Sequence, residues 1–421
     1  MPLQTWRWIR DPIKVLERGR DRYGDTFTLR LPHEGTWVVT SDPDDIKRIF
    51  TAAPSEALAG EANRILLPIL GPSSVLLLDG EAHIAQRRLL LPRFHGERMV
   101  GYGDLMGELA AVEAASWPVG VTFTARPRMQ ALTFEIIMRA VFGVEGGARQ
   151  QELRELLRTL LERISDPRSF GAVILLGPER IQRFAFARRG MERVDRLLFE
   201  EIAARRRDSE LEERVDILSL LVQATHPDGA PMSDPEIRDE VMTLLVAGHE
   251  TTATALSWAL ERLARHPEIA DRLALEIAAG EDTYLDAVVK EVLRLRPVIA
   301  LVLRRLVEPM EIGGRVLPAG VKVVPCIHLL HRRPEIYADP ERFRPERFLE
   351  HPAGTYTWIP FGGGVRRCLG AAFAEFEMRA VLREIVFKWR IEAGRSTSEP
   401  LRRRSITNVP GHGARIRVSA R

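Results

Sequence analysis

The feature that most constrains the fold is a long helical pattern at residues 233–266, "SDPEIRDEVMTLLVAGHETTATALSWALERLARH". Ser233 and Glu236 have the spacing of a capping box, and Pro235 suits a first helical turn. The pattern ends before Pro267, because proline cannot continue a helix. A helix of about 30 residues is far longer than the mean of about 11–12. We therefore expect it to be the central element of a large, mainly helical fold.

Shorter patterns surround this helix. Apolar residues recur at helical spacing through most of residues 97–295, for example at 152–164 and 190–207, and again at 371–389. Alternating residues at 26–31 and 36–41 flank "PHEG" and predict a β-hairpin, and strands are expected again within 300–330. No repeat or linker interrupts the chain. We predict one domain over residues 1–421, mainly α with a smaller β portion.

Charge and cysteine content narrow the class of protein. The chain has 421 residues and a net charge of +3, with basic and acidic residues interleaved, which argues against nucleic acid as a partner. It has two cysteines, Cys326 and Cys368; a disulfide between them is left open, but so few favour a reducing compartment. The N-terminus lacks an apolar run, and the most apolar stretch, 241–260, contains His249 and Glu250. We expect a cytoplasmic protein without a membrane anchor.

The stretch "FGGGVRRCLG" at 361–370 surrounds Cys368 with glycine and positive charge. Glycines 362–364 lack Cβ, so a flat ligand can lie against the backbone. Cys368 is expected at the start of a helix near Leu369, where the helix dipole and two arginines favour a thiolate. Such a thiolate is a nucleophile or a metal ligand. Zinc would require neighbouring Cys or His residues, whereas haem iron requires only one axial thiolate.

The fixed positions of this stretch resemble the haem-binding signature F-G-x-G-x-R-x-C-x-G of the cytochrome P-450 family, soluble bacterial type. The matching residues are Phe361, Gly362, Gly364, Arg366, Cys368 and Gly370. The resemblance extends over nearly the whole chain. It implies the cytochrome P-450 fold, with haem b between the long central helix and the helix of the cysteine loop. It also implies that Cys368 is the axial ligand of the haem iron.

A second motif, "AGHETT", lies midway along the long helix. Small Ala247 and Gly248 leave room beside the helix, and Thr251 and Thr252 can bond to backbone carbonyls and open the helical ladder locally. Glu250 beside Thr251 pairs an acid with an alcohol, which suits proton delivery. A threonine-rich surface face would not explain the buried acid. The motif resembles the family's A-G-x-[DE]-T signature, which implies that Thr251 and Glu250 are catalytic and that Ala247 and Gly248 contact the cofactor.

Several basic residues are candidates for the two haem propionates, which favour cationic partners. "HIAQR" places His83 and Arg87 one helical turn apart, and "LRRL" supplies Arg304 in a predicted strand. The resemblance assigns His83, Arg87, Arg304 and Arg366 to the propionates. Because Arg305 is adjacent to Arg304, the register of the strand decides which of the two faces the haem.

Two further clusters have other expected roles. The family resemblance assigns Glu291, Arg294 and Arg347 to a buried, fold-stabilising set. "CIHLLH" is a rival metal site, because Cys326 and His328 would share one face of a strand and His331 is close. No fourth ligand is near, so we do not expect a metal there.

The resemblance implies a haem-thiolate monooxygenase. It would insert one atom of O2 into a C–H or C=C bond of an apolar small molecule such as a fatty acid, terpenoid or steroid. Electrons would come from NAD(P)H through a separate ferredoxin and ferredoxin reductase, and we expect a monomer. Segments implied to line the pocket are 62–78, 169–181, 297–303 and 405–413, and a basic docking face would comprise Arg88, Arg93, Arg98 and Arg367.

Two other function classes stay open. The first is a donor-independent haem-thiolate peroxygenase, isomerase or dehydratase, which the intact Glu250–Thr251 pair disfavours. The second is a non-catalytic haem sensor, which would need neither the acid nor the alcohol and for which no fused output domain is visible.

Overall fold

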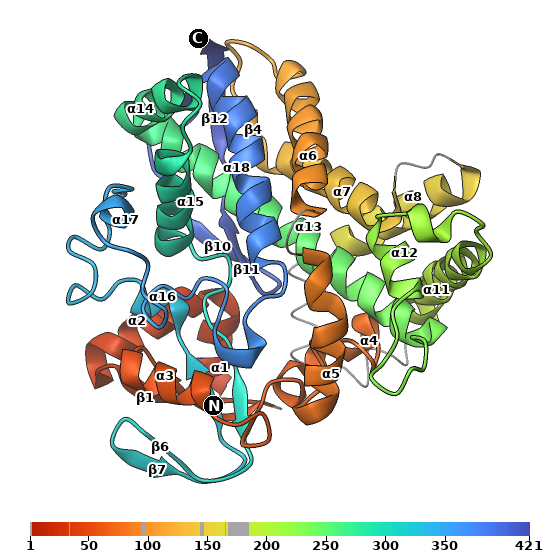
Figure 1. Ribbon diagram of the computed structural model, residues 1–421. Coiled ribbons are helices and arrows are strands. Elements are labelled where there is room, and N and C mark those ends of the chain that lie inside the picture. Colours follow the sequence, from red (N-terminus) through yellow and green to blue (C-terminus); the bar gives the residue numbers. More distant parts are fainter. Residues whose placement is uncertain (1, 33, 95–97, 144–146, 165, 167–184) are drawn as a thin grey trace.

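The long helix lies at the centre of the molecule (Figure 1). The computed structural model describes all residues except 1, 33, 95–97, 144–146, 165 and 167–184. Helix α13 spans Asp234–Arg265, and both hydrogen bonds of the predicted capping box, between Ser233 and Glu236, are present. It packs against α7 (Ala125–Phe142) and α18 (Ala371–Lys388), so the prediction of a central helix is confirmed.

Other helices enclose α13 on several sides. Helices α14, α15 and α18 lie together on one side, and α8, α11 and α12 group on another (Figure 1). Most of the 97–295 region is helical, as predicted. The bounds are α4 (Leu67–Leu70), α5 (Gly80–Leu90), α6 (Arg98–Ala115), α8 (Ala148–Ile164), α11 (Ala185–Arg206), α12 (Ile217–Val222), α14 (Pro267–Ala278) and α15 (Thr283–Leu295), with short 3-10 turns η1 (Glu61–Leu66), η2 (Leu91–Phe94) and η3 (Leu211–Glu213).

A five-stranded sheet lies away from the helical region and has the order β1-β2-β8-β5-β3. Thr26 is opposite Thr40 in the antiparallel β1–β2 pair, which confirms the predicted hairpin, whereas β2 and β8 are parallel. Helix α2 packs against β1, and α3 packs against β8. The bounds are β1 (Thr26–Leu31), β2 (Gly35–Thr40), β3 (Ala57–Leu58), β5 (Arg304–Leu306), β8 (Lys322–Pro325), α1 (Pro2–Arg10), α2 (Pro12–Tyr23) and α3 (Pro43–Thr51).

Short strands and turns complete the β portion. The order of a three-stranded sheet is β4-β12-β9, and β6–β7 and β10–β11 form separate antiparallel pairs. The strand expected to continue through His328 is wrong: β8 ends at Pro325, and Ile327–Leu330 form a helical turn, α16. The remaining bounds are β4 (Phe123–Thr124), β6 (Met310–Ile312), β7 (Arg315–Leu317), β9 (Trp389–Ala393), β10 (Leu401–Arg404), β11 (Thr407–Pro410), β12 (Arg415–Ala420), α17 (Arg347–Glu350) and η4 (Gly364–Arg366).

The largest buried cluster extends from Val75 to Val418 and has α13 within it, including the fully buried Trp258. Two smaller clusters cover the two faces of the five-stranded sheet; one contains Phe27 and the other contains Val38. No helix in the part of the chain that the structure describes is long and apolar enough to cross a bilayer.

The predicted buried ionic set is confirmed. Arg294 Nε donates to Glu291 Oε2 at 2.7 Å, and the side chains of both residues are 0% exposed. Arg347 Nε donates to the other carboxylate oxygen, Oε1, at 3.1 Å. Arg294 also donates to the carbonyls of His331 and Pro340. The set therefore fixes α15 to the irregular chain around residues 331–347, just before the cysteine loop.

Candidate functional site

The cysteine loop is closed by its own backbone. The N–H of Cys368 donates to the carbonyl of Phe361 at 3.0 Å, so the intervening residues form a compact turn that contains η4. Helix α18 begins at Ala371 with Gly370 as its N-cap, so Cys368 precedes the helix by slightly more than predicted. Cys368 is exposed and free, and Cys326 is buried and free, so the two do not form a disulfide.

The glycines of this loop meet two different requirements. Gly364 has a φ of +63°, and an added Cβ would lie 2.0 Å from the carbonyl oxygen of Phe50; a Cβ on Gly363 would collide with the Phe50 ring. At Gly370 nothing of the described protein lies within 4 Å of an added Cβ, and at Gly362 only Val302 does, at 3.9 Å. Packing against α3 therefore explains Gly363 and Gly364, whereas Gly362 and Gly370 border open space.

Cys368 lies in a concave setting. Its side chain is exposed, yet burial raises the pKa of the thiol above its ordinary value. The N–H of Gly370 and the charges of Arg367 and Arg87 act in the opposite direction. The cationic surroundings were expected to favour the thiolate, but desolvation outweighs them. A coordinated metal ion supplies the additional positive charge that deprotonates a thiol in such a site.

The predicted propionate residues lie close together. Burial, followed by the charges of Arg366, Arg87 and Arg304, lowers the pKa of His83 to about 3. His83 is therefore neutral at physiological pH and can act as a hydrogen-bond donor. Arg87 Nη1 donates to the carbonyl of Arg367 at 2.7 Å, which links α5 to the cysteine loop.

The register of β5 distinguishes the two adjacent arginines. Arg304 is buried, and its guanidinium donates to the carbonyl of Leu303. Arg305 points to the opposite face of the strand, where Nη1 donates to Glu61 Oε2 at 2.9 Å. Only Arg304 therefore faces His83 and Arg366.

The residues present fit a haem group. Among the described residues, His83 Nδ1 is buried without a hydrogen-bond partner, and Arg304 makes no ion pair. Arg366 has one acidic partner, Asp79, at 2.5 Å. A buried cationic cluster with this deficit of negative charge requires anionic partners. The two carboxylates of haem would provide them, next to a free cysteine suited to axial ligation.

One face of α13 is accessible in a helix that is otherwise mostly buried. Leu244, Ala247, Gly248 and Thr251 follow i, i+3, i+4, i+7 spacing and all retain solvent exposure. The Thr251 hydroxyl donates to the carbonyl of Ala247 at 2.6 Å. The helix nevertheless continues unbroken through these residues, so the expected local opening of the ladder is not seen. The accessible face is formed by one leucine, two small residues and one hydroxyl group.

Glu250 is buried on a different side of the same helix. Its carboxylate is ion-paired with Arg126 of α7, and Gln130 Nε2 donates to Oε2 at 2.7 Å. Glu250 and Thr251 are therefore adjacent in sequence but do not contact each other through their side chains: Glu250 bonds to α7 and Thr251 to its own helix.

Four residues in contact with this site were missed from the sequence. Asp79 pairs with Arg366 and also accepts hydrogen bonds from the backbone N–H groups of Ala59, Gly60 and Glu61. Glu377 of α18 is buried and bonded to the Thr252 side chain of α13, which joins the two helices. Arg126 and Gln130 hold Glu250. No local signal in the sequence identifies these partners, because each lies far along the chain from the residue it contacts.

The rival metal constellation is not assembled. His331 Nε2 accepts the N–H of Ile359 at 2.9 Å, and Nδ1 contacts the carbonyl of Arg294 at 3.2 Å. His328 lies between Glu17 and Arg332. No cluster of His, Cys, Asp or Glu suited to a metal ion occurs among the described residues. These histidines are structural.

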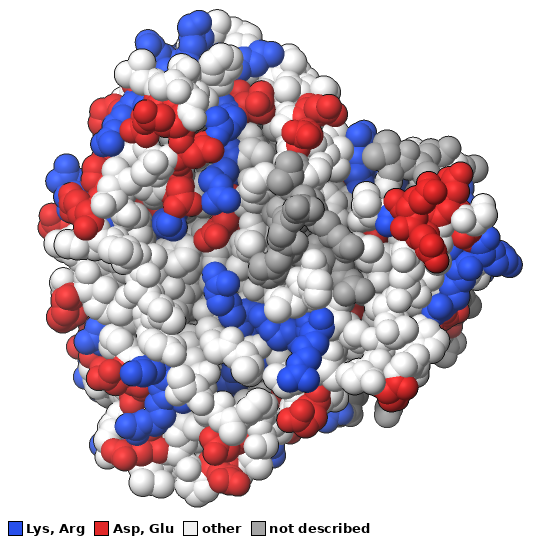
Figure 2. Space-filling model, in the orientation of Figure 1, with Lys and Arg blue, Asp and Glu red and all other residues white. Residues whose placement is uncertain are grey.

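Two predicted surfaces are only partly described. Arg88 and Arg367 are exposed, and Figure 2 shows basic side chains gathered over α5 and the cysteine loop. The side chains of Arg93 and Arg98 lie outside the described part of the structure, as does the predicted pocket segment 169–181.

Comparison with known proteins identifies related sequences and folds. Residues 3–412 match the family model described as cytochrome P-450. A Mycobacterium bovis protein named cytochrome P-450 135B1 is 44% identical over 427 aligned residues, which cover 99% of this chain and 89% of that protein. A Mycobacterium tuberculosis protein named cytochrome P-450 135A1 is 41% identical, with 99% and 93% coverage.

Solved structures show the same fold at lower identity. A retinoic acid-bound cyanobacterial CYP120A1 superposes with a TM-score of 0.86 at 24% identity and covers 99% of this chain and 96% of that chain. The haem domain of cytochrome P450DA gives a TM-score of 0.82 at 24% identity, with 97% and 93% coverage.

Proposed function

The chain belongs to the cytochrome P-450 family of haem-thiolate monooxygenases, and from this premise we propose that it oxidises an apolar small molecule with electrons from a separate ferredoxin and its reductase. The reaction would insert one atom of O2 into a C–H or C=C bond. One observation carries the assignment of the site: an accessible Cys368 lies beside a buried basic cluster that contains Arg304 without an acidic partner.

The cysteine loop and the basic cluster would hold haem b. Cys368 would supply the sulfur that binds the haem iron, and His83, Arg87, Arg304 and Arg366 would bind the propionates. When bound, haem with an axial thiolate supplies the activation of O2 and the transfer of oxygen to carbon. Ala247 and Gly248 would allow a flat group to lie close to α13, because neither has a side chain beyond Cβ.

Thr251 would be the residue that positions a proton beside the oxygen substrate. Its hydroxyl proton is held by the Ala247 carbonyl, so the oxygen lone pairs are left to accept a hydrogen bond from a water at the accessible face. Glu250 would feed protons to this water. Its ion pair with Arg126 keeps the carboxylate buried, so proton delivery would require Glu250 to leave Arg126 transiently.

The substrate class rests on the segments expected to border the pocket. Residues 65–69 and 76–78 supply partly exposed isoleucine, leucine and proline side chains, and Ile406 at the tip of the β10–β11 pair is 46% exposed. Partly exposed apolar side chains from separate segments suit an apolar ligand. One protein with the same fold is described as bound to retinoic acid, an isoprenoid carboxylic acid. We propose a fatty acid, terpenoid or steroid as substrate.

The redox partner would dock over the cysteine loop. The exposed Arg88 and Arg367 contribute to the basic surface there (Figure 2), and such a surface suits an acidic electron-transfer protein. A ferredoxin reduced by NAD(P)H through its reductase has this chemistry. The two free cysteines support a reducing compartment, and we propose the cytoplasm.

Two measurements test this function. The reduced, carbon monoxide-treated protein should show the absorbance band typical of a thiolate-ligated haem, and Cys368→Ser should abolish it. Apolar compounds that shift the Soret band are then assayed with NADPH, a ferredoxin pair and O2. Turnover with peroxide alone would favour the donor-independent class, and binding without turnover would favour a sensor.

A further inference from the structure

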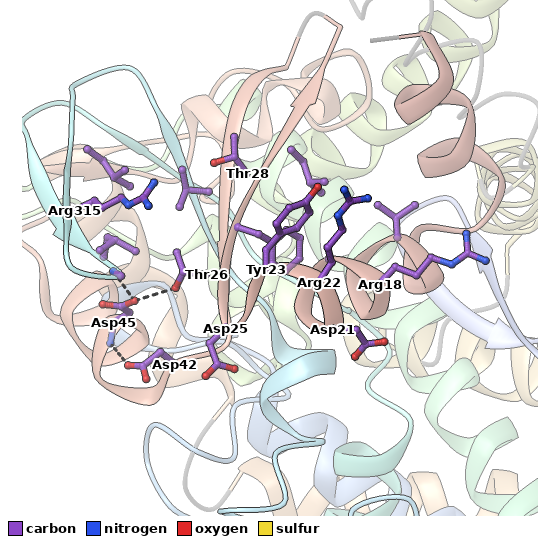
Figure 3. Close-up of a pocket in the computed structure, with 18 of the residues that line it drawn as sticks. Arg18, Asp21, Arg22, Tyr23, Asp25, Thr26, Thr28, Asp42, Asp45 and Arg315 are labelled. Atoms are coloured by element: carbon purple, nitrogen blue, oxygen red, sulfur yellow. Dashed lines mark hydrogen bonds between the residues drawn. The ribbon is translucent and has the colours of Figure 1, made fainter.

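A cavity lies between α2, β1 and the β6–β7 hairpin, and its lining does not include the cysteine loop. It has a volume of about 1510 Å³. Figure 3 shows β1 crossing it, with Arg315 of the hairpin on one side of the strand and Arg18 and Arg22 of α2 on the other. The cavity is therefore a groove that follows β1, the terminal strand of the five-stranded sheet.

The backbone of β1 has unused hydrogen-bonding groups along this groove. The carbonyl of Asp25 accepts the N–H of Ser41 in the β1–β2 ladder. Because antiparallel pairing alternates, the N–H and C=O groups of Thr26 and Thr28 must point away from β2. Arg30 follows the same alternation, and its N–H donates to Gln4 Oε1 at 3.3 Å. Within the described chain, the backbone groups of Thr26 and Thr28 have no such partner.

The acidic side chains of the groove are mostly engaged within the protein. Asp25 pairs with Arg333 at 2.8 Å. Asp42 caps α3. Asp45 accepts hydrogen bonds from the N–H of Gly313 at 2.9 Å and the hydroxyl of Thr40 at 3.2 Å. Asp25 is therefore neutralised by its ion pair, whereas Asp42 and Asp45 keep their charge, which is directed to backbone N–H groups at the start of α3 and at Gly313.

The basic side chains of the groove are not engaged in this way. Among described residues, no ion pair is made by the exposed arginines that line it, which are Arg7, Arg18, Arg22 and Arg315. Asp21 is the one lining acid, of those described, that is neither ion-paired nor hydrogen-bonded. Of the lining residues, the exposed charged ones are therefore these four arginines, on both sides of an open strand edge, against one aspartate, Asp21.

We propose that the free edge of β1 accepts an extended acidic segment of a partner protein as an added strand. The backbone of the segment would pair with Thr26 and Thr28. Its side chains would alternate between α2 and the hairpin, so acidic residues would reach Arg18 and Arg22 on one face and Arg315 on the other. A second copy of this chain is a poor occupant, because pairing two β1 edges would bring two sets of these arginines together.

The probe is a peptide of about eight residues in which Glu-Glu and Val-Val pairs alternate, which places Glu on both faces of a strand and is long enough to span a typical one. Its binding to the holoprotein is measured by fluorescence anisotropy, and hydrogen exchange of the Thr26 and Thr28 amides is followed by NMR. Two matched probes are a Lys-Val peptide and a Glu-Val peptide N-methylated at alternate residues. Thr28→Pro removes an edge N–H, with Thr28→Ala as control, and Arg22→Glu reverses a groove charge, with the exposed Arg390→Glu as control.

The expected result is binding of the Glu-Val peptide with slowed exchange at Thr26 and Thr28. Thr28→Pro and Arg22→Glu should each weaken it about tenfold or more, while both control variants bind normally. The proposal fails if the N-methylated or Lys-Val peptide binds equally well, or if nothing binds at about 1 mM. It also fails if the chain alone forms a dimer that Thr28→Pro dissociates, because the edge would then be a self-interface.

Discussion

Glu250 of α13 and Arg126 of α7 lie 124 residues apart in the sequence and form a buried ion pair. Glu250 directly precedes Thr251, whose hydroxyl is proposed to act on oxygen. The carboxylate next to Thr251 is thus committed to a structural contact in the resting protein. The ion pair shows that Glu250 holds α7 to α13, a structural role that is separate from the proton supply proposed for it.

Removing the arginine should destabilise the protein. Arg126→Met leaves the Glu250 carboxylate buried without its counter-ion, so we expect a loss of about 3 kcal/mol in the free energy of unfolding. Urea unfolding measures it. Adding Glu250→Gln should recover part of the loss, since Gln130 can still bond to the amide. Arg128→Met, which affects a more exposed arginine paired with Glu113, should cost much less. If Arg126→Met and Arg128→Met lowered the free energy of unfolding equally, burial of the Arg126–Glu250 pair would not be the cause of the loss.

The Thr251 hydroxyl should control how electrons are used. We expect Thr251→Ala to lower product formation by about 10²-fold while NAD(P)H consumption continues, because the hydroxyl oxygen that would position the proton-donating water is lost. Hydrogen peroxide release should rise in proportion. Thr251→Ser retains the hydroxyl and should stay coupled. If the alanine variant formed product as efficiently as the native enzyme, Thr251 would have no role in proton delivery.

Glu240 should make stability dependent on pH. Its Oε1 accepts from the Val75 N–H at 2.8 Å and Gln86 Nε2 at 3.0 Å, and its Oε2 is buried without a partner among the described residues. Burial raises the pKa of Glu240 from 4.5 to about 8, and the charges of Asp239 and Glu236 add to the rise. The folded protein therefore keeps a proton on Glu240 that the unfolded chain loses.

The contribution of the neutral Glu240 carboxyl to the free energy of unfolding is fully present below pH 4.5 and is lost as the pH rises to about 8. The loss is about 1.4 kcal/mol per pH unit at most. Glu240→Gln is neutral at every pH, so its stability relative to the native protein should increase from about pH 5 to about pH 8.5. Thermal unfolding at both pH values checks this. Glu268→Gln, at a residue with a 69% exposed side chain, is the control. A constant difference between native protein and Glu240→Gln would refute the raised pKa.

The buried Glu291 set should be required for stability. Glu291→Gln leaves Arg294 and Arg347 without their shared carboxylate, and we expect a loss of about 3–5 kcal/mol. Glu350→Gln disrupts an exposed pair with Arg344 and should cost less than about 1 kcal/mol. Chemical denaturation compares the two variants. A small loss of unfolding free energy for Glu291→Gln would mean that the backbone carbonyls around Arg294 are enough to hold its guanidinium in place.

Arg304 and Arg305 offer a matched test of haem retention. Arg304 faces the basic cluster, whereas Arg305 pairs with Glu61 on the other side of the strand. Arg304→Gln should increase the rate of haem loss to an acceptor protein by about tenfold or more, since a hydrogen bond to a charged group contributes about 1.5–3 kcal/mol. Arg305→Gln should change it little. Faster haem loss from Arg305→Gln than from Arg304→Gln would overturn the proposed contact between Arg304 and a propionate.

Local signals in the sequence were sufficient to predict the main helix and the first hairpin and to identify the cysteine motif. The capping box at Ser233 and the stop before Pro267 act over a few residues, so they predict α13 without any tertiary information. Alternation around "PHEG" likewise predicts β1 and β2. The His328 strand failed because the apolar residues of α16 are buried on all sides, and such a short run has no period that separates strand from helix.

What the sequence predicted by itself was the chemistry: which residue would supply sulfur, which would supply positive charge, and which helix would carry the acid and the alcohol. The tertiary structure decided the partners. It selected Arg304 over Arg305 and assigned Arg126 to Glu250. It also left Glu240 partly unpaired and β1 with an open edge. The physical reason is separation along the chain: caps, turns and motifs act between near neighbours, whereas burial and ion pairing depend on segments that meet only after the chain has folded.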